Sequence, residues 1–331
     1  MGDLKKLNLA NLPTPIQKLT HISKELGVDI YIKRDDLTGG ETSGNKIRKL
    51  EYTVAKAMDE GAQLLITCGG IQSNHCRATA AVAAKLGLRS HLVLRIDEEP
   101  PVEGNYLLDK ILGAEITFIS RADYSKRRAE IMQNIKEEYE KQGIKAYVIP
   151  EGASDGIGNI GYLESVKEIK KQEEELGISF QTIVCAVGSG STYGGLFLGT
   201  KLYDPEKTVL GFNVCDDEQY FLDVCTRICR ETVELLGKNI EIKPEDMHIV
   251  DGHKGIGYAI STDEELAFLI KLAREEGLIL DPVYTGKAFY GLYQEIKEGK
   301  LKDLGNVLFI HTGGVFGLFP KQEQLAKVLE A

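Results

Sequence analysis

Short apolar runs alternate with longer helical patterns along most of the chain. Runs such as residues 64–68, 182–187 and 307–311 are largely apolar, which is typical of strands buried on both faces of a sheet. Glycine or proline ends many of the longer stretches. The pattern predicts strands at residues 30–36, 64–68, 91–94, 116–119, 146–149, 182–187, 209–214 and 307–311, and helices at residues 46–58, 105–112, 124–142, 159–176, 218–236, 262–276 and 286–298.

This alternation indicates an α/β protein built on parallel sheets. A right-handed crossover through a helix is the usual connection between two parallel strands of one sheet. The pattern of strands and helices starts afresh near residue 158, after a break at Pro150. The two halves therefore predict two α/β domains, the second beginning near residue 159.

Composition and charge narrow the class of protein. The 331 residues are 43% apolar and 27% charged, as in globular proteins. No apolar run approaches the ~18 residues of a membrane span, and no signal-peptide pattern is present, so we expect a cytoplasmic protein without a membrane partner. The net charge of −10 argues against nucleic acid as the main partner. The six cysteines lack paired zinc-ligand spacing, so we expect reduced thiols and no metal site.

Lys46 stands at the start of a predicted helix, after a turn that ends in Ser43, Gly44 and Asn45. Ser43 or Asn45 could cap that helix. The positive end of the helix dipole disfavours a cation and lowers the pKa of the lysine amine. Because a neutral amine can attack an aldehyde, Lys46 is a candidate nucleophile; a solvated surface lysine is the alternative.

A glycine-rich turn at residues 188–195 follows one predicted strand and opens an apolar helix. Glycines let backbone N–H groups converge, and the helix N-terminus adds positive charge, so such a turn can hold a phosphate. The turn has neither the Gly-Lys-Ser/Thr of a P-loop nor the Rossmann spacing. A turn made for close packing of the helix on the strand is the alternative. The phosphate-binding candidates are Ser189, Gly190, Ser191 and Thr192.

A second glycine turn, residues 69–75, follows the strand at 64–68 and precedes another helix. Open α/β sheets bind ligands at this end of their strands, so the turn could hold a substrate carboxylate. Taken alone, Ser73 is most simply the N-cap of the helix.

Three further hydroxyl groups stand in or beside turns. Tyr258 directly follows a glycine, Tyr284 stands two residues from both a proline and a glycine, and Thr312 follows the last predicted strand. Such tyrosines usually serve packing, and a threonine at a strand end is common. Each hydroxyl could instead face a ligand or move a proton.

Together these motifs resemble those of the fold-type II pyridoxal-phosphate (PLP) enzymes. The segments KRDDLTGGETSGNKIRKLEY, residues 33–52, and GGIQSN, residues 69–74, are similar to the group containing D-cysteine desulfhydrase and 1-aminocyclopropane-1-carboxylate (ACC) deaminase. The resemblance covers nearly the whole chain. It implies a two-domain fold like that of the tryptophan synthase β-subunit, three-layer α/β/α with parallel sheets. Residues 1–49 and 159–331 would form the large PLP-binding domain, and residues 50–158 the small domain.

The resemblance also implies a role for each candidate residue. Lys46, Ser73 and Tyr284 would be catalytic: Lys46 would hold PLP covalently, Ser73 would hold the substrate carboxylate or pass a proton, and Tyr284 would stack near PLP or move a proton. Asn74 would donate to the PLP 3′-oxygen, and Thr312 would face the pyridine nitrogen. The cofactor-binding set is Lys46, Asn74, Ser189, Gly190, Ser191, Thr192 and Thr312, and the substrate-binding set is Ser73, Asn74, His75, Tyr258, Tyr284 and Thr285.

The implied reaction releases ammonia from a small amino acid and leaves a 2-oxo acid, as a lyase or hydrolase would. D-cysteine would give pyruvate, hydrogen sulfide and ammonia, whereas ACC would give 2-oxobutanoate and ammonia. ACC deaminases carry glutamate and leucine where this chain has Thr285 and Thr312. A carboxylate beside the pyridine nitrogen keeps it protonated and strengthens the electron sink, whereas thiolate is a good leaving group and needs a weaker one. We therefore expect a D-cysteine desulfhydrase, with ACC deaminase as the alternative.

Two hypotheses come from other classes of protein. A non-catalytic α/β protein could bind a phosphate ligand with the same glycine turn. A nucleotide-dependent enzyme would need a set of magnesium ligands, which the sequence does not offer. The family resemblance further implies a homodimer.

Overall fold

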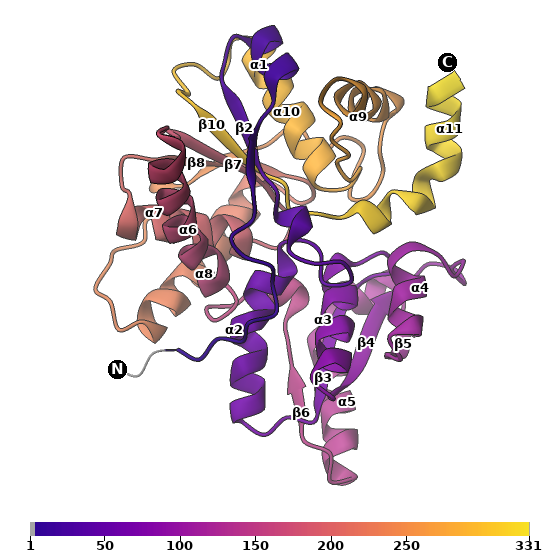
Figure 1. Ribbon diagram of the computed structural model, residues 1–331. Helices are drawn as coiled ribbons and strands as arrows, with labels where there is room; N and C mark the ends of the chain where they lie inside the picture. The colour runs from indigo at the N-terminus through magenta and orange to yellow at the C-terminus, as the bar shows by residue number, and fades with distance from the viewer. Residues whose placement is uncertain (1–3, 331) are drawn as a thin grey trace.

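The computed structural model describes residues 4–330 and contains two separate sheets with helices packed around them (Figure 1). One sheet has six strands in the order β1-β2-β10-β7-β8-β9, and the other has four in the order β5-β4-β3-β6. The strands are β1 (Ile16–Lys18), β2 (Ile30–Lys33), β3 (Leu64–Gly70), β4 (Arg89–Arg95), β5 (Glu115–Ile119), β6 (Ala146–Val148), β7 (Thr182–Val187), β8 (Thr208–Asn213), β9 (His248–Val250) and β10 (Val307–Ile310). The helices are α1 (Thr20–Leu26), α2 (Lys46–Asp59), α3 (Asn74–Lys85), α4 (Gly104–Ile111), α5 (Arg121–Lys141), α6 (Ile160–Leu176), α7 (Ser191–Tyr203), α8 (Glu218–Leu235), α9 (Asp263–Glu276), α10 (Thr285–Lys297) and α11 (Gln322–Glu330).

The pairing of the strands confirms the expected α/β class. Every neighbouring pair is parallel except β1 and β2, which run antiparallel. The strands β1 and β9 were not predicted, because three residues carry too little pattern to distinguish a strand from a turn. The expected strand at 30–36 was too long: β2 ends at Lys33, and Asp35 starts a short 3₁₀ turn whose buried carboxylate binds Arg48.

The six-stranded sheet has a hydrophobic core on each face. Along β7, Val184 and Ala186 pack on one face with residues of α9 and α10. Ile183, Cys185 and Val187 pack on the other face with residues of α6, α7 and α8. This alternation explains why the run at 182–187 is apolar throughout, and it produces three layers.

The four-stranded sheet is covered on both faces in the same way. Leu64, Ile66 and Cys68 of β3 pack against α5, whereas Leu65 packs with residues of α2 and α3. The strands of this sheet all come from residues 64–148, while the six-stranded sheet uses both ends of the chain. The domain boundaries at residues 49/50 and 158/159 remain a prediction.

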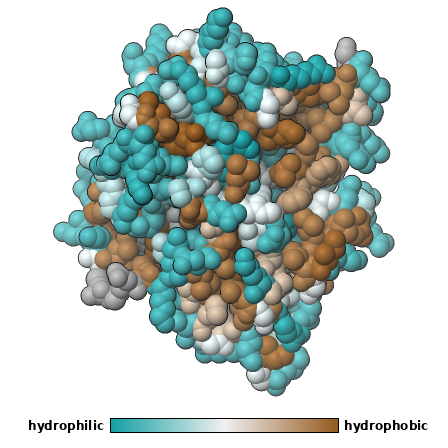
Figure 2. Space-filling model, viewed as in Figure 1, coloured by the Kyte–Doolittle hydropathy of each residue, from teal (hydrophilic) through white to brown (hydrophobic). Residues whose placement is uncertain are grey.

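The surface in Figure 2 is mostly hydrophilic, with brown apolar areas on the side where α4 and α11 lie in Figure 1. Large apolar side chains that are exposed include Leu107 and Ile111 of α4, Phe319, and Leu329 of α11. Across residues 4–330, no helix is long and apolar enough to cross a membrane.

Candidate active site

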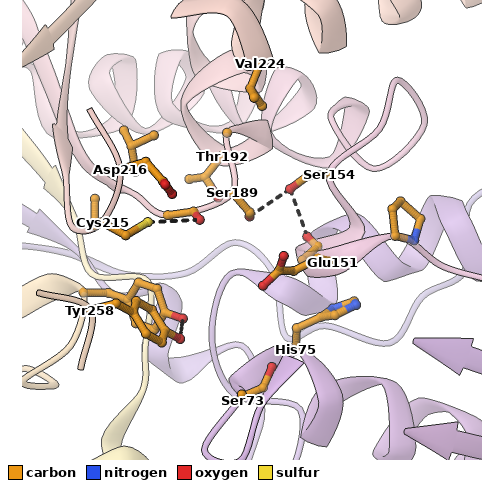
Figure 3. A pocket seen from close by; sticks show the side chains of 18 of the residues that line it. Ser73, His75, Glu151, Ser154, Ser189, Thr192, Cys215, Asp216, Val224 and Tyr258 are labelled. Carbon is orange, nitrogen blue, oxygen red and sulfur yellow. Dashed lines mark hydrogen bonds between the residues drawn. The ribbon is translucent and has the colours of Figure 1, made fainter. Parts of the chain in front are cut away.

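A cavity of about 840 Å³ is lined by residues from strands of both sheets and from the neighbouring helices (Figure 3). Its walls include the carboxyl end of β3, the end of β7, and the starts of α2, α3 and α7. Parallel sheets commonly bind ligands at this edge. Ten of the twelve candidate residues line the cavity: Lys46, Ser73, Asn74, His75, Ser189, Gly190, Thr192, Tyr258, Tyr284 and Thr312. Ser191 and Thr285 are fully buried behind the wall.

Lys46 is the first residue of α2 and reaches into the cavity. Burial lowers the pKa of its amine to about 8, although the charges of Glu151 and Asp281 act in the opposite direction. Asn45 occupies the N-cap position, but its side chain donates to Thr192 Oγ1 at 2.9 Å and makes no capping bond. The expectation that Ser43 or Asn45 caps α2 through its side chain was therefore wrong.

Lys49 lies one turn after Lys46 and was missed by sequence reasoning. Its side chain is fully buried, and its Nζ donates at 3.4 Å to the Gly152 carbonyl. Burial and the neighbouring charge of Lys46 hold the pKa of Lys49 well below its usual value. Neither amine has an ion pair with a carboxylate in the part of the chain that the structure describes. The spacing of three residues on a helix was the signal that could have placed both amines together.

The start of α7 forms a cradle of donors beside these amines. Gly190 precedes the helix with φ +96°, and no side chain caps the first N–H groups. Ser154 Oγ donates to Ser189 Oγ at 2.8 Å (Figure 3) and also contacts Ser191 Oγ at 3.0 Å. Ser191 does not line the cavity itself, but its hydroxyl contacts Ser154, which does. Sequence reasoning missed Ser154 because it lies far along the chain from the glycine turn at 188–195. Uncapped N–H groups, hydroxyls and the Lys49 amine are the donor set that a phosphate dianion requires.

Ser73 and Asn74 stand at the start of α3. Ser73 Oγ accepts from the Cys76 N–H at 3.2 Å, so Ser73 is the helix N-cap while it also lines the cavity. Asn74 Oδ1 accepts from Asn105 Nδ2 at 3.0 Å, which orients the amide so that its Nδ2 remains available.

His75 has a fixed tautomer. Thr67 Oγ1 donates to the Ile149 carbonyl at 2.8 Å, so its 2.8 Å contact with His75 Nε2 requires that Nε2 carry the proton. His75 Nδ1 is then a bare acceptor, without a partner among the residues described. Burial, with the charges of Lys46 and Lys49, lowers the pKa of His75 well below its usual value, so the ring is neutral.

Tyr258 and Tyr284 share a short hydrogen bond between their hydroxyls. Burial raises the pKa of Tyr258 to about 12 and that of Tyr284 further, so both are protonated near neutral pH. Thr312 also lines the cavity. Thr285 points elsewhere, because its Oγ1 donates to Asp281 Oδ1 at 2.6 Å behind the wall.

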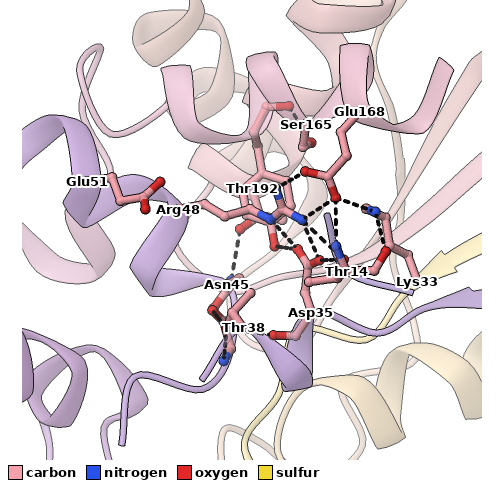
Figure 4. Close-up of polar contacts among 12 residues, drawn as sticks. Thr14, Lys33, Asp35, Thr38, Asn45, Arg48, Glu51, Ser165, Glu168 and Thr192 are labelled. Atoms are coloured by element: carbon pink, nitrogen blue, oxygen red, sulfur yellow. Dashed lines mark hydrogen bonds and ion pairs between the residues drawn. The ribbon is translucent and has the colours of Figure 1, made fainter. Parts of the chain in front are cut away.

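Buried ion pairs hold α2 from the side opposite the cavity (Figure 4). Arg48 donates to both oxygens of Asp35 at 2.8 Å and to both oxygens of Glu168 at 2.9 Å. Lys33 pairs with Glu168 at 2.7 Å. Arg48 and Lys33 keep the pKa of Asp35 near 2 despite its burial. These contacts fix the helix that carries Lys46.

A family profile described as "Pyridoxal-phosphate dependent enzyme" matches residues 7–313. The chain belongs to this family. PLP is its cofactor, and the expected fold type II is confirmed. The protein is an enzyme that acts on a small amino acid, so the hypothesis of a non-catalytic phosphate-binding protein was wrong. The buried amines and the donor cradle at α7 fit the cofactor's phosphate, and the Lys46 amine fits its aldehyde.

Curated relatives carry both expected names. The chain is 45% identical over 334 residues to a mitochondrial bifunctional D-cysteine desulfhydrase/ACC deaminase of Arabidopsis thaliana, covering 97% of this chain and 81% of that protein. It is 43% identical to a putative ACC deaminase of Pyrococcus abyssi, with 98% and 96% covered. It is 38% identical to a D-cysteine desulfhydrase of Yersinia enterocolitica, with 98% of each covered. These names describe lyases, so the alternative label of hydrolase was wrong.

Solved structures agree with the fold. A crystal structure titled as an ACC deaminase homologue superposes with a TM-score of 0.90 at 41% identity, covering 98% of this chain and 97% of that one. A threonine deaminase from T.th. superposes with a TM-score of 0.65 at 19% identity, covering 91% and 92%, which shows the shared fold alone.

Proposed function

We propose that this enzyme is a D-cysteine desulfhydrase, which converts D-cysteine and water into pyruvate, hydrogen sulfide and ammonia. The observation that carries the proposal is the hydroxyl of Thr312 at the cavity wall, next to the turn that holds Lys46: the Asn45 N–H donates to the Thr312 carbonyl at 3.0 Å. A hydroxyl at this place leaves a pyridine nitrogen near neutral, which suits the expulsion of a good leaving group. The name of the Yersinia relative supports the same substrate.

In the proposed reaction, each residue of the cavity would have a separate role in binding the substrate or moving a proton. Bound PLP supplies the electron sink. Lys46 Nζ, with its pKa near 8, accepts the Cα proton. The Ser73 turn holds the substrate carboxylate with its N–H groups, and Asn74 donates toward the 3′-oxygen of the cofactor. Tyr284, protonated and linked to Tyr258, donates a proton to the leaving sulfur.

The cofactor would lie between α2 and α7. The cradle at Ser189, Gly190 and Thr192 holds the phosphate, and Ser191 supports the cradle through Ser154. His75 lines the cavity and would be a neighbour of the substrate, although its Nδ1 is itself buried. Thr285 acts indirectly in this proposal, because it orients Asp281 in the turn that carries Tyr284.

Turnover of D-cysteine and ACC by the PLP-loaded enzyme tests the proposal. We expect kcat/KM for D-cysteine to exceed that for ACC, with sulfide and pyruvate formed in equal amounts. The name of the Arabidopsis relative keeps ACC deaminase as the second candidate. Thr312→Leu removes the hydroxyl, and we expect it to lower the D-cysteine to ACC ratio by more than about tenfold, equivalent to ~1.4 kcal/mol. A parent enzyme that prefers ACC would overturn the choice of substrate.

We also propose that the enzyme is cytoplasmic and forms a homodimer, with residues 1–49 plus 159–331 and residues 50–158 as its domains. The exposed apolar side chains at α4 and α11 support association with a second copy. Light scattering of the purified protein measures the mass, and a mass near 36.5 kDa would contradict the dimer.

A further inference from the structure

Lys287 is a buried cation whose donors all end on backbone carbonyls of one loop. It lies in the first turn of α10, and its side chain is fully buried. Its Nζ donates to the carbonyls of Lys254 at 2.6 Å, Gly257 at 3.0 Å and Ile260 at 2.7 Å. Because an ammonium group has three N–H donors, these three carbonyls satisfy all of them.

The position of Lys287 is unfavourable for a cation. The start of a helix carries positive charge from its own N–H groups, and burial lowers the pKa of the Lys287 amine. Glu265 raises that pKa, but its Oε1 lies 3.7 Å from Lys287 Nζ, and its Oε2 accepts from the Thr262 N–H. The carbonyls are therefore the main compensation for the buried charge, which connects Lys287 to the loop more closely than to the carboxylate.

The loop that Lys287 holds, residues 251–260, contains neither a helix nor a strand. Ala259 has a φ of +60°, a left-handed conformation that residues with a side chain adopt mainly where their surroundings impose it. A second side-chain contact with α10 joins His253 Nε2 to Glu295 Oε1 at 2.8 Å. The loop thus depends on side chains of α10 for its shape. Without the ammonium group, three carbonyl oxygens would point at one another across an unfilled space, and the loop would have to change its conformation.

The same loop places Tyr258 in the cavity wall. The Tyr258 hydroxyl shares a short hydrogen bond with that of Tyr284 (Figure 3), and Tyr284 is the N-cap residue of α10, three residues before Lys287. The first turn of α10 therefore holds both tyrosines: Tyr284 belongs to it, and Tyr258 is held through the carbonyls of Gly257 and Ile260 on either side. The position of Lys287 thus determines where the two hydroxyls meet.

We propose that Lys287 is a positioning residue that holds Tyr258 against Tyr284, and that its ammonium group fills what would otherwise be a site for a free monovalent cation. The positioning role rests on the proposed function, in which Tyr284 donates the proton. The carbonyl distances of 2.6 Å to 3.0 Å suit a large monovalent ion better than calcium or magnesium, which bind oxygen at about 2.0–2.6 Å. Carbonyl oxygens can replace the water shell of potassium, so potassium is the ion expected to substitute for the ammonium group.

Two substitutions separate the charge of Lys287 from the space that it occupies. Lys287→Met removes the charge and keeps most of the side chain, whereas Lys287→Ala also opens the space between the carbonyls. In the PLP-loaded enzyme, both should lower kcat for D-cysteine up to about 100-fold, as expected for a misplaced catalytic group. Potassium chloride should restore at least about tenfold of this loss in Lys287→Ala and raise its melting temperature, because a bound ion stabilises the folded state. Neither effect should appear in Lys287→Met, in the parent, or with tetramethylammonium chloride at the same concentration.

A double variant tests whether Lys287 acts through Tyr258. Tyr258→Phe removes the hydroxyl that Lys287 is proposed to place, so adding Lys287→Met to Tyr258→Phe should lower kcat by at most about twofold further. Losses that multiply in full would mean that Lys287 supports the fold in general, and they would overturn the positioning role. Lys297→Met, at an exposed position of α10, is the matched control and should leave kcat unchanged.

The response to potassium decides the cation site. An unchanged melting temperature of Lys287→Ala in potassium chloride, or an equal rise in the parent or in Lys287→Met, would overturn it. A parent enzyme that does not turn over D-cysteine would overturn the proposed function and with it the positioning role. The melting temperatures do not depend on turnover, so failure of the proposed function is distinguishable from failure of the cation site.

Discussion

The two sides of α2 carry charged groups in opposite states. On the side away from the cavity, Arg48 binds the carboxylates of Asp35 and Glu168. Each carboxylate also accepts hydrogen bonds from other groups, such as the Tyr162 hydroxyl on Asp35. On the cavity side, Lys46 and Lys49 lie together without a carboxylate ion pair in the described structure, and both have lowered pKa values. The same helix therefore carries one cluster in which the buried cation is paired with carboxylates, around Arg48, and one in which the buried amines have no such partner, at Lys46 and Lys49.

This difference distinguishes charges that stabilise the fold from charges that await a ligand. A buried ion is tolerated when opposite charges and hydrogen bonds compensate for its loss of water, as they do around Arg48. Two adjacent buried amines without that compensation raise the free energy of the cofactor-free protein. In the proposed site, the phosphate of bound PLP would supply the missing negative charge, so PLP binding would remove this cost and stabilise the protein.

Removing the Lys46 amine should have the largest effect. Lys46→Ala should lower kcat/KM by more than about 10⁴-fold and abolish covalent PLP, because the Lys46 amine is the group that would bond the PLP aldehyde. Its melting temperature without PLP should not fall below that of the parent, because the variant removes one of the two uncompensated buried amines. Lys56→Ala, an exposed position on the same helix, is the control. Retained activity with PLP reducible onto another lysine would contradict the assignment.

Breaking the complete cluster should instead lower stability. Arg48→Met leaves Asp35 and Glu168 without their main cation, so unfolding free energy should fall by about 3–5 kcal/mol. Denaturant melts of the cofactor-free protein measure this loss. Arg89→Met breaks an exposed pair with Glu115 and should cost at most about 1 kcal/mol. Equal losses in the two variants would show that the buried cluster does not stabilise α2.

The sequence was sufficient where local pattern determines structure. The apolar runs predicted the central strands, because a strand covered on both faces must be apolar throughout. The helix start at Lys46 was also correct, and each glycine-rich segment does contain a turn before a helix, since turn residues and helix termini have local signals. Both turns are shorter than predicted, because β3 extends to Gly70, α3 begins at Asn74 and α7 begins at Ser191. The assigned roles of the site residues stay predictions.

Tertiary contacts explain what the sequence did not predict. Two of the missed residues, Ser154 and Arg95, line the cavity, and the third, Lys49, donates to the carbonyl of Gly152 in the cavity wall. They come from different elements, and no sequence motif connects them. Thr285 was expected at the substrate, but its hydroxyl is engaged by Asp281, four residues earlier in the same turn. Whether a side chain near a glycine turn faces the cavity depends on such partners.

Replacing Lys49 tests whether a buried amine on the cavity side of α2 serves PLP binding and not stability. Lys49→Met removes the buried amine, so affinity for PLP should fall about 10- to 100-fold, because one charge-assisted contact to the phosphate is lost. Stability without PLP should not decrease, in contrast to Arg48→Met. Reconstitution titrations and melts of the cofactor-free protein measure both. A loss of stability as large as that of Arg48→Met would mean that Lys49 is structural.

The smallest effect concerns how pH controls the capture of PLP. Because burial lowers the pKa of Lys46 to about 8, the neutral amine that attacks the aldehyde increases as pH rises through about 8. The rate of covalent reconstitution should therefore rise about tenfold between pH 7 and pH 9 and then level off. The charge of Glu151 raises the pKa of Lys46, so Glu151→Gln should move the midpoint to lower pH. Stopped-flow absorbance of cofactor-free enzyme mixed with PLP measures the rate. A midpoint near that of an ordinary lysine would show that the Lys46 amine is solvated, and the two sides of α2 would then differ less than their contacts indicate.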